Sequence, residues 1–434
     1  MGPLLSTHGN SFKVFSTLLT LGLGSSSALA QNNDLTEIAT SIRLQVTLET
    51  TTLRGQHFVA DLEGGGLAQL TLQPAMQKLV EEALAAHHLP FASAAVISIP
   101  DGKVLALAGY SKADPTLDAA TLALRPWAPA ASVFKIIAAS ALLQEGRLDP
   151  ETRVCYHGGV SSILRDNLID LPAIDHACAS LGYGIGKSQN AIIAKLATQK
   201  LRPEQLERTA AAFGFGQDIG FDAEMEPSEV EIPRDPLEFA RAAAGFWHST
   251  LSTLHGALLA ATIANHGEMP APSIIEKAVD AQGAPVRLPK MPSRRVLDSS
   301  VAEQVGKMMQ LTTSMGTARR SFRDRQGHRF LPVEVAGKTG TLFYRGRPSD
   351  PTLPGSMTPS DGSQIGYSWF VGFAPADQPK IAFAVLLGNP FAQIKAHSVA
   401  RQLLTDYLAG EGTGTTGKHS RLLATISRHI LSQR

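Results

Sequence analysis

Short apolar stretches near both ends of the main part of the chain predict β-strands. They are rich in β-branched or aromatic residues or alternate between apolar and polar positions, and glycine, proline or polar residues bound them. The expected strands are Ala68–Leu72, Ala92–Ile99, Val104–Ala108, Val333–Leu342, Ser368–Pro375 and Ile381–Gly388. The turn sequence Pro100-Asp101-Gly102 between the second and third stretches predicts a hairpin.

The middle of the chain has longer segments rich in alanine, leucine and isoleucine, which favour helices. We expect helices at Ser132–Leu143, Ser188–Gln199 and Thr253–Asn265, one from Pro74 through Ala86, and a last one from about Phe391 to Leu408. Strands at both ends with helices between and after them predict an α+β fold. In this fold one antiparallel sheet, made from both chain ends, is flanked by helices, and the central helices form an all-helical subdomain.

The N-terminus has the organisation of a secretory signal peptide. Lys13 precedes the apolar run Val14–Leu23, and the small-residue site Ala28-Leu29-Ala30 comes before Gln31. The run is too short to cross a bilayer comfortably as a helix. We therefore expect cleavage after Ala30 and export to the periplasm or to the outer face of the inner membrane, with an uncleaved anchor as the alternative.

The same patterns divide the chain into parts. A signal peptide (1–30) is followed by an N-terminal linker segment (31–66) that ends at the turn Gly64-Gly65-Gly66, by the main domain (67–410) and by a tail (411–434). The tail opens with a Gly/Thr-rich linker and continues with apolar residues at helical spacing, interspersed with arginines. A basic amphipathic helix of this kind is expected to contact an anionic membrane surface. A disordered tail is the alternative.

Composition and charge narrow the range of partners. The 434 residues are 44% hydrophobic and 18% charged, as in an ordinary globular protein. A formal net charge of +1 gives no electrostatic reason to expect nucleic acid as a partner. There is no His-Glu-x-x-His pattern and no paired Cys-x-x-Cys pattern, so we expect no metal site and no cofactor. No pattern identifies a protein partner.

The chain contains two cysteines, Cys155 and Cys178. Export would place them in an oxidising compartment, where a disulfide between them is plausible. Such a bridge would close a modest loop and stabilise the fold by roughly 3 kcal/mol. Two separately buried, reduced thiols are the alternative.

Ser132 and Lys135 form the first candidate catalytic pair. Their spacing of three places both side chains on one helix face. A serine needs a base within hydrogen-bond reach to become a good nucleophile. A lysine can be that base only if burial or a second cation lowers its pKa, and Lys338 is a candidate for the second cation. The residues around Lys135 are apolar, which favours burial, although a capping serine followed by a surface lysine would give the same spacing.

Ser188-Gln189-Asn190 is the second candidate motif. It offers a hydroxyl that can pass a proton and an amide that can hold a peptide carbonyl. Gly186-Lys187-Ser188 also looks like the end of a phosphate-binding loop. However, Leu181 stands where that loop needs a glycine, so we do not expect nucleotide binding.

Lys338-Thr339-Gly340-Thr341 is the third candidate motif, and it lies on a strand-like run. A cation with neighbouring hydroxyls can hold a terminal carboxylate. A glycine on a strand lets a substrate backbone approach the strand edge. Alone, this motif would also be compatible with an exposed turn.

The three motifs in this order resemble the transpeptidase domain of penicillin-binding proteins, within the superfamily of serine β-lactamases and penicillin-recognising enzymes. The resemblance runs from about Ala68 to Leu408. It includes Leu70–Pro74, Gly109-Tyr110, Gly316–Ala318 and Trp369–Phe373. It implies a peptidoglycan D,D-transpeptidase, which cross-links stem peptides ending in D-Ala-D-Ala and is acylated by β-lactam antibiotics.

By position, the resemblance implies that Ser132 attacks the D-Ala-D-Ala bond, that Lys135 takes its proton, and that Ser188 passes it to the leaving D-alanine. Asn190 would orient the donor peptide. The terminal carboxylate would bind at the third motif, which consists of Lys338, Thr339, Gly340 and Thr341. The backbone N–H groups of Ser132 and Thr341 would form the oxyanion hole.

Three other functions remain open at this point. A D,D-carboxypeptidase would use water as the acceptor and cannot be separated by sequence. A serine β-lactamase of one large class would need Glu-x-x-Leu-Asn, but Asn265 is the only asparagine between Asn190 and Lys338. A non-catalytic β-lactam sensor or cell-wall scaffold could retain the fold, although the intact motifs argue against it.

Overall fold

The computed structural model describes residues 43–289, 291–343 and 365–411 of the chain. The expected signal peptide, and all but the first residue of the expected tail, lie outside the described residues. Within the described part, no helix combines the length and the apolar character that crossing a membrane requires.

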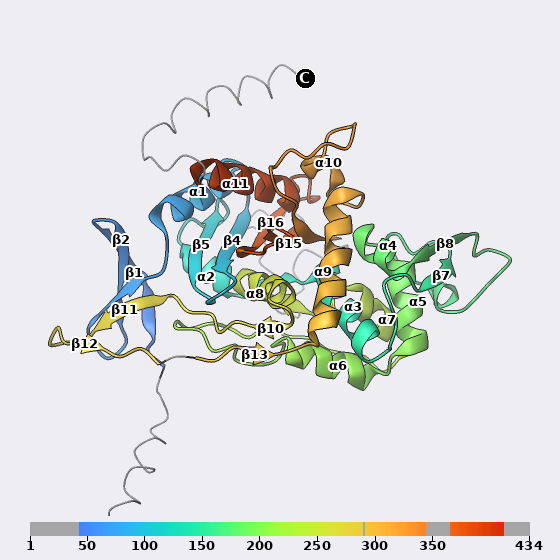
Figure 1. The fold of residues 1–434 in the computed structure, drawn as a ribbon, viewed down its shortest axis with the longest axis horizontal. Helices are drawn as coiled ribbons and strands as arrows, with labels where there is room; N and C mark the ends of the chain where they lie inside the picture. The colour runs from blue at the N-terminus through green and yellow to red at the C-terminus, as the bar shows by residue number, and fades with distance from the viewer. Residues whose placement is uncertain (1–42, 290, 344–364, 412–434) are drawn as a thin grey trace, which may run out of the picture. The chain divides into compact units, whose positions relative to one another are not determined.

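A five-stranded antiparallel sheet with the order β14-β15-β16-β4-β5 lies at the centre of the fold (Figure 1). Two of its strands, β4 (Phe91–Ser98) and β5 (Val104–Ser111), form the hairpin expected from the sequence. The other three come from late in the chain and are β14 (Ala336–Phe343), β15 (Ile365–Ala374) and β16 (Ile381–Pro390). The two groups join where β16 pairs with β4. The predicted α+β fold, with a sheet made from both chain ends, is confirmed.

Helices cover both faces of this sheet because its strands alternate between two apolar clusters (Figure 1). On β4, Ala94 faces the cluster shared with α1 (Pro74–Ala85) and α11 (Ala396–Glu411). The next residue, Ala95, faces the cluster shared with α8 (Thr253–Ala264). Every residue of α8 is buried, as expected of a helix that is mostly apolar and contains no Asp, Glu, Lys or Arg.

A second five-stranded sheet has the order β1-β2-β3-β11-β12. Its strands are β1 (Val46–Arg54), β2 (His57–Leu62), β3 (Leu67–Leu70), β11 (Ile275–Val279) and β12 (Pro285–Val286). The prediction of a linker at 31–66 is therefore wrong from residue 46 onward. Val46 on β1 and Leu62 on β2 are directly opposite each other, and both are buried. The sheet also includes β11, which is remote in sequence and pairs with β3. Gly64-Gly65-Gly66 is the turn between β2 and β3, with positive φ at each residue.

The middle of the chain forms a mostly helical region. Its helices are α3 (Lys135–Gln144), α4 (Leu181–Gly186), α5 (Asn190–Lys200), α6 (Pro203–Ala212), α7 (Pro236–Ala244) and, later in the chain, α9 (Ser299–Ser314). It also contains a hairpin of β7 (Arg153–Tyr156) and β8 (Ala177–Ser180), so it is not all-helical. Cys155 and Cys178 face each other across this hairpin and form a disulfide.

Short elements complete the described part. They are the helices α2 (Ala119–Leu124) and α10 (Arg319–Phe322), the 3-10 turns η1 (Ala131–Phe134) and η2 (Arg165–Leu168), and the strands β6 (Ala128–Pro129), β9 (Thr250–Leu251), β10 (Glu268–Met269) and β13 (Arg294–Arg295). The turn η1 contacts both β14 and α7. Because η1 carries Ser132, the edge strand of the central sheet and the helical region meet at this residue.

Candidate active site

Ser132 lies in the turn η1, directly before α3, which begins at Lys135. The spacing of three brings the Lys135 Nζ to 2.7 Å from the Ser132 Oγ. Ser132 is half-buried, whereas Lys135 has no exposed surface. The hydroxyl is therefore accessible beside an amine that bulk water does not reach.

Three oxygen atoms surround the amine of Lys135. The Nζ lies 2.7 Å from each of the Ser132 Oγ, the Asn190 Oδ1 and the Ala244 carbonyl oxygen. An ammonium group donates to all three. A neutral amine can donate to Asn190 and Ala244 while its lone pair accepts the hydroxyl proton of Ser132. Both protonation states are thus satisfied in one geometry, as a general base requires.

The electrostatics favour the neutral state of this lysine. Burial, and after it the positive charge of Lys338, hold the pKa of Lys135 well below its usual value of 10.5. These are the two causes expected from the sequence. Ser132 and Lys135 therefore have the arrangement of an activated nucleophile with its base.

Lys338 and Ser188 form a second pair at the site. The Lys338 Nζ donates to the Ser188 Oγ and to the Thr339 carbonyl oxygen, at 2.9 Å in both cases. Lys338 is fully buried, and this burial lowers its pKa from 10.5 to about 7. Ser188 was expected to begin a helix, but it precedes α5 and has a φ of +54°, in the left-handed region. The turn aims its hydroxyl at Lys338.

The rest of the third motif follows the edge strand β14. The Thr339 hydroxyl forms a hydrogen bond of 2.6 Å with the Thr317 hydroxyl. A Cβ at Gly340 would lie 3.0 Å from the Trp369 Cβ and 3.3 Å from a methyl group of Val133, so the strand passes close to η1. Thr341 is exposed, next along the strand. Since β14 ends the sheet, its outer edge can receive an extended peptide.

A model of the penicillin-binding protein transpeptidase domain family matches residues 92–406 of the chain. The chain belongs to this family. Stage V sporulation protein D of Bacillus subtilis is 24% identical over 340 residues, which cover 75% of this chain and 49% of that protein. Peptidoglycan D,D-transpeptidase PbpA of Mycolicibacterium smegmatis is 26% identical over 266 residues, covering 60% of this chain and 49% of that protein.

Solved structures of penicillin-binding proteins share the fold of this transpeptidase domain. Penicillin-binding protein A from M. tuberculosis, solved as an imipenem acyl-enzyme complex, matches with a TM-score of 0.62 at 22% sequence identity. The match covers 79% of this chain and 80% of that chain. The chain spans about half the length of the curated relatives named above.

Three contacts of this penicillin-binding transpeptidase domain come from residues outside the motifs. They are the Ala244 carbonyl at Lys135, the Val160 carbonyl at Asn190, and the Thr317 hydroxyl at Thr339. Two of them are made by main-chain carbonyl groups, which every residue has, so the amino-acid sequence does not show which carbonyl lies at the site. Thr317 belongs to Gly316-Thr317-Ala318, a stretch that the family resemblance included without a role.

Gly245 explains how the Ala244 carbonyl reaches the site. It ends α7 with a φ of +85°. A Cβ at this position would lie 2.1 Å from the carbonyl oxygen of Ala131, the residue before Ser132. Only a glycine lets the end of α7 approach the backbone of the nucleophile so closely.

Proposed function

We propose that this chain is a peptidoglycan D,D-transpeptidase that works through a serine acyl-enzyme. The observation that carries the proposal is the fully buried Lys135 amine, 2.7 Å from the Ser132 Oγ. A general base must lie within hydrogen-bond reach of the proton it takes, with a pKa near the working pH. The position of Lys135 meets the first requirement, and burial and the charge of Lys338 shift its pKa in the direction of the second.

In the proposed acylation step, the Ser132 Oγ attacks the carbonyl carbon of the penultimate D-alanine, and its proton moves to the Lys135 Nζ. The bond between this carbon and the nitrogen of the terminal D-alanine then breaks. Ser188 passes a proton to the leaving amine, which is consistent with its hydrogen bond to Lys338. The backbone N–H groups of Ser132 and Thr341 stabilise the developing oxyanion.

In the same proposal the third motif binds the terminal carboxylate through Lys338, Thr339 and Thr341. A negative charge next to Lys338 favours the protonated amine. Substrate would therefore raise the pKa of Lys338 from about 7 and convert it to a cation on binding. Asn190 orients the donor peptide.

The second half of the reaction frees the enzyme. An amine of a neighbouring stem peptide attacks the ester carbon, the Ser132 oxygen leaves and regains its proton, and a cross-link forms. A β-lactam would acylate Ser132 in the same way. The name of the M. smegmatis relative and the imipenem acyl-enzyme of the M. tuberculosis protein support this proposal.

Labelling with a fluorescent penicillin tests the acyl-enzyme. We expect the protein to gain one covalent label, located on the peptide that contains Ser132, and Ser132→Ala to gain none. Circular dichroism should show that the variant is folded. A label that persists in Ser132→Ala would contradict the assignment.

The acceptor is tested with a D-Ala-D-Ala stem peptide and an amine acceptor. Cross-linked product supports the transpeptidase, and release of D-alanine with hydrolysed peptide alone supports a D,D-carboxypeptidase. Rapid turnover of penicillin would identify a β-lactamase, and the absence of any adduct would indicate a scaffold.

We also propose that the protein acts outside the cytoplasm. The signal-like segment that ends at Ala30 supports export, and the basic tail 418–434 supports contact with an anionic membrane surface. N-terminal sequencing of the mature protein tests cleavage after Ala30. Co-sedimentation with anionic vesicles tests the tail, and binding that survives truncation after Gly410 would contradict this part.

A further inference from the structure

The segment between the two cysteines reaches the active site. Cys155 and Cys178 lie opposite each other on β7 and β8, so their disulfide closes the segment 156–177 at its base. Within this segment, the Val160 carbonyl oxygen accepts a hydrogen bond of 2.9 Å from the Asn190 Nδ2. The other end of the same amide, Oδ1, accepts one of 2.7 Å from the Lys135 Nζ. A single side chain thus connects the closed segment to the reactive lysine.

The Val160 carbonyl determines which way the Asn190 amide faces. An amide has one donor end and one acceptor end, whereas a carbonyl only accepts. The NH2 group must therefore face Val160, which leaves the oxygen for Lys135. If the amide turned over, its N–H groups would face those of Lys135, and the amine would lose an acceptor that holds it beside Ser132.

Gly159 lets the segment come this close to α5. It has a φ of +71°, and a Cβ there would lie 2.5 Å from the Cβ of Ala191, the second residue of α5. Carbon atoms of two side chains do not approach to that distance. The position of the Val160 carbonyl therefore depends on close contact between the segment and the start of this helix.

A second buried lysine fixes the segment from the same helix. Lys195 lies on α5 and has no exposed surface. Its Nζ donates to the Cys155 carbonyl oxygen at 2.8 Å and to the Asp175 Oδ2 at 2.7 Å. A further contact of 3.3 Å joins it to Asp170, whose side chain is largely exposed. Lys195 thus holds both arms of the segment, next to the disulfide.

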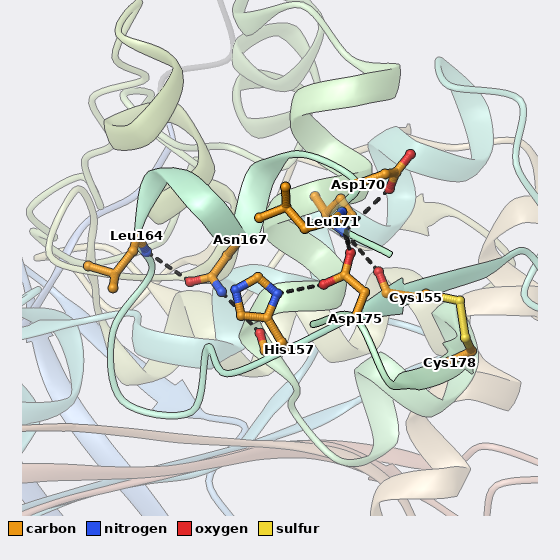
Figure 2. Close-up of polar contacts among 9 residues, drawn as sticks. Cys155, His157, Leu164, Asn167, Asp170, Leu171, Asp175 and Cys178 are labelled. Carbon is orange, nitrogen blue, oxygen red and sulfur yellow. Dashed lines mark hydrogen bonds and ion pairs between the residues drawn. A yellow bond between two sulfur atoms is a disulfide. The ribbon is translucent and has the colours of Figure 1, made fainter. Parts of the chain in front are cut away.

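Asp175 is the main counter-charge of Lys195. Its Oδ1 lies 2.5 Å from the His157 Nδ1, and its Oδ2 also accepts from the Leu171 N–H at 2.9 Å (Figure 2). Burial by itself favours the neutral acid, but the hydrogen bonds from His157, Lys195 and Leu171 outweigh it and hold the pKa of Asp175 well below its usual range. The carboxylate is therefore charged, and all its partners belong to the segment or to α5.

Stability alone does not explain a buried ion pair at this place. Desolvation opposes the Coulomb attraction, so two apolar side chains of similar size would stabilise the fold as well. An ion pair with several hydrogen bonds does fix the direction of each partner. Because this ion pair lies between α5 and the closed segment, it can hold the segment in a fixed position relative to the helix.

We propose that Lys195, Asp175 and the disulfide position the Val160 carbonyl, and that they affect the reaction by orienting Asn190 toward Lys135. Lys195 is a positioning residue in this scheme and does not touch the substrate. The inference rests on the proposed function, because its effect is read from the rate of acylation of Ser132.

A double-mutant cycle tests the route through Asn190. The acylation rate with a fluorescent penicillin is measured for the full-length protein and for Lys195→Met, Asn190→Ala and the double variant. We expect Lys195→Met to slow acylation by about five- to tenfold in the wild-type background, as for the loss of one oriented hydrogen bond. In the Asn190→Ala background the same change should slow it less than about twofold, because the coupled partner is already absent. Equal effects in both backgrounds would overturn the proposal.

Arg43→Met is the matched control. It also breaks a buried ion pair, Arg43–Asp222 at 2.6 Å, with 14% and 7% of the side chains exposed. Asp222 lies outside the closed segment and α5, and its carboxylate also binds the N–H groups of Ile274 and Ile275. We expect a lower melting temperature with an unchanged acylation rate at 25 °C. A rate loss equal to that of Lys195→Met would show that general destabilisation, not positioning, slows the reaction.

Reduction of the disulfide provides a second route if Lys195→Met does not fold. The reduced protein should be acylated more slowly than the oxidised one, and this difference should disappear in Asn190→Ala. If the oxidised wild-type protein is not acylated at all, the proposed function fails. If it is acylated, and both Lys195→Met and the reduced protein react at the wild-type rate, only the positioning proposal fails.

Discussion

Replacing Lys338 by methionine should stabilise the protein at neutral pH and destabilise it at high pH. Methionine has a similar length and fills the same buried space without a charge. In the folded protein burial lowers the pKa of Lys338 from 10.5 to about 7. Between these two values the unfolded chain binds a proton that the folded chain does not, so the stability of the wild type rises with pH.

The size of the effect follows from the pKa and from the hydrogen bonds. One pKa unit corresponds to about 1.4 kcal/mol, so the wild type is destabilised by about 4 kcal/mol at pH 7. This penalty is fully present below pH 7 and disappears as the pH rises toward 10.5. The hydrogen bonds of Lys338 to Ser188 and to the Thr339 carbonyl act in the opposite direction, by about 1 kcal/mol each. Lys338→Met should therefore be more stable by about 2 kcal/mol at pH 7 and less stable by about 1 kcal/mol near pH 10.

Urea denaturation followed by circular dichroism at a series of pH values measures this reversal of sign. Lys78→Met is the control, because the Lys78 side chain is 74% exposed and its ion pair with Glu82 is weak. Its free energy of unfolding should differ little from that of the wild type at every pH. If the difference between Lys338→Met and the wild type does not change with pH, burial does not lower the pKa of Lys338, and the electrostatic basis of the site is refuted.

Three further measurements should give equally specific results. Because the charge of Lys338 lowers the pKa of Lys135, Lys338→Met should also move the rising limb of the acylation rate to higher pH. A pH series of penicillin labelling measures it, and an unmoved limb would speak against the coupling. Gly245→Ala, whose Cβ would lie 2.1 Å from the Ala131 carbonyl oxygen, should slow acylation at least about tenfold. Gly283→Ala is the control, because Gly283 has a similar positive φ but a Cβ there would meet no atom within 4 Å. It should leave the labelling rate unchanged and lower the free energy of unfolding by about 1 kcal/mol. Equal labelling rates for the two variants would contradict the positional role of Gly245. Reduction of the disulfide should lower the free energy of unfolding by about 3 kcal/mol, and denaturation midpoints that coincide with and without reductant would show otherwise.

The local sequence pattern was sufficient to predict those features of the site that lie on a single helix or strand. The spacing of Ser132 and Lys135 predicted their contact, because a helical turn fixes which side chains share a face. The apolar neighbours of Lys135 predicted its burial. The strand that carries Lys338 was predicted within a few residues of its ends, because its alternation and flanking residues are local properties.

Contacts between remote parts of the chain were not predictable in this way. Residues 46–62 were expected in a linker. They belong to a sheet instead, because β2 pairs with β3 and β3 pairs with the remote strand β11, and a local pattern does not show such pairing. Ser188 was placed in a helix because Ser-Gln-Asn is compatible with a helix start, and nothing local indicates its left-handed φ. The carbonyl groups of Val160 and Ala244 are common to every residue type, so only the fold shows what they do.

The pairing of β16 with β4 has a consequence for the order in which the protein matures. The two strands are separated by most of the folded chain, and closing so long a loop is an entropically unfavourable and slow step. Trp369 lies on β15, which pairs with β16, and it donates to the Pro129 carbonyl just ahead of η1; β14, which pairs with β15, carries Lys338. The turn that carries Ser132 is therefore completed only when the last strands have docked. A nascent or truncated chain without these strands would also lack the charge of Lys338, which lowers the pKa of Lys135, so the candidate site is complete only at the end of folding.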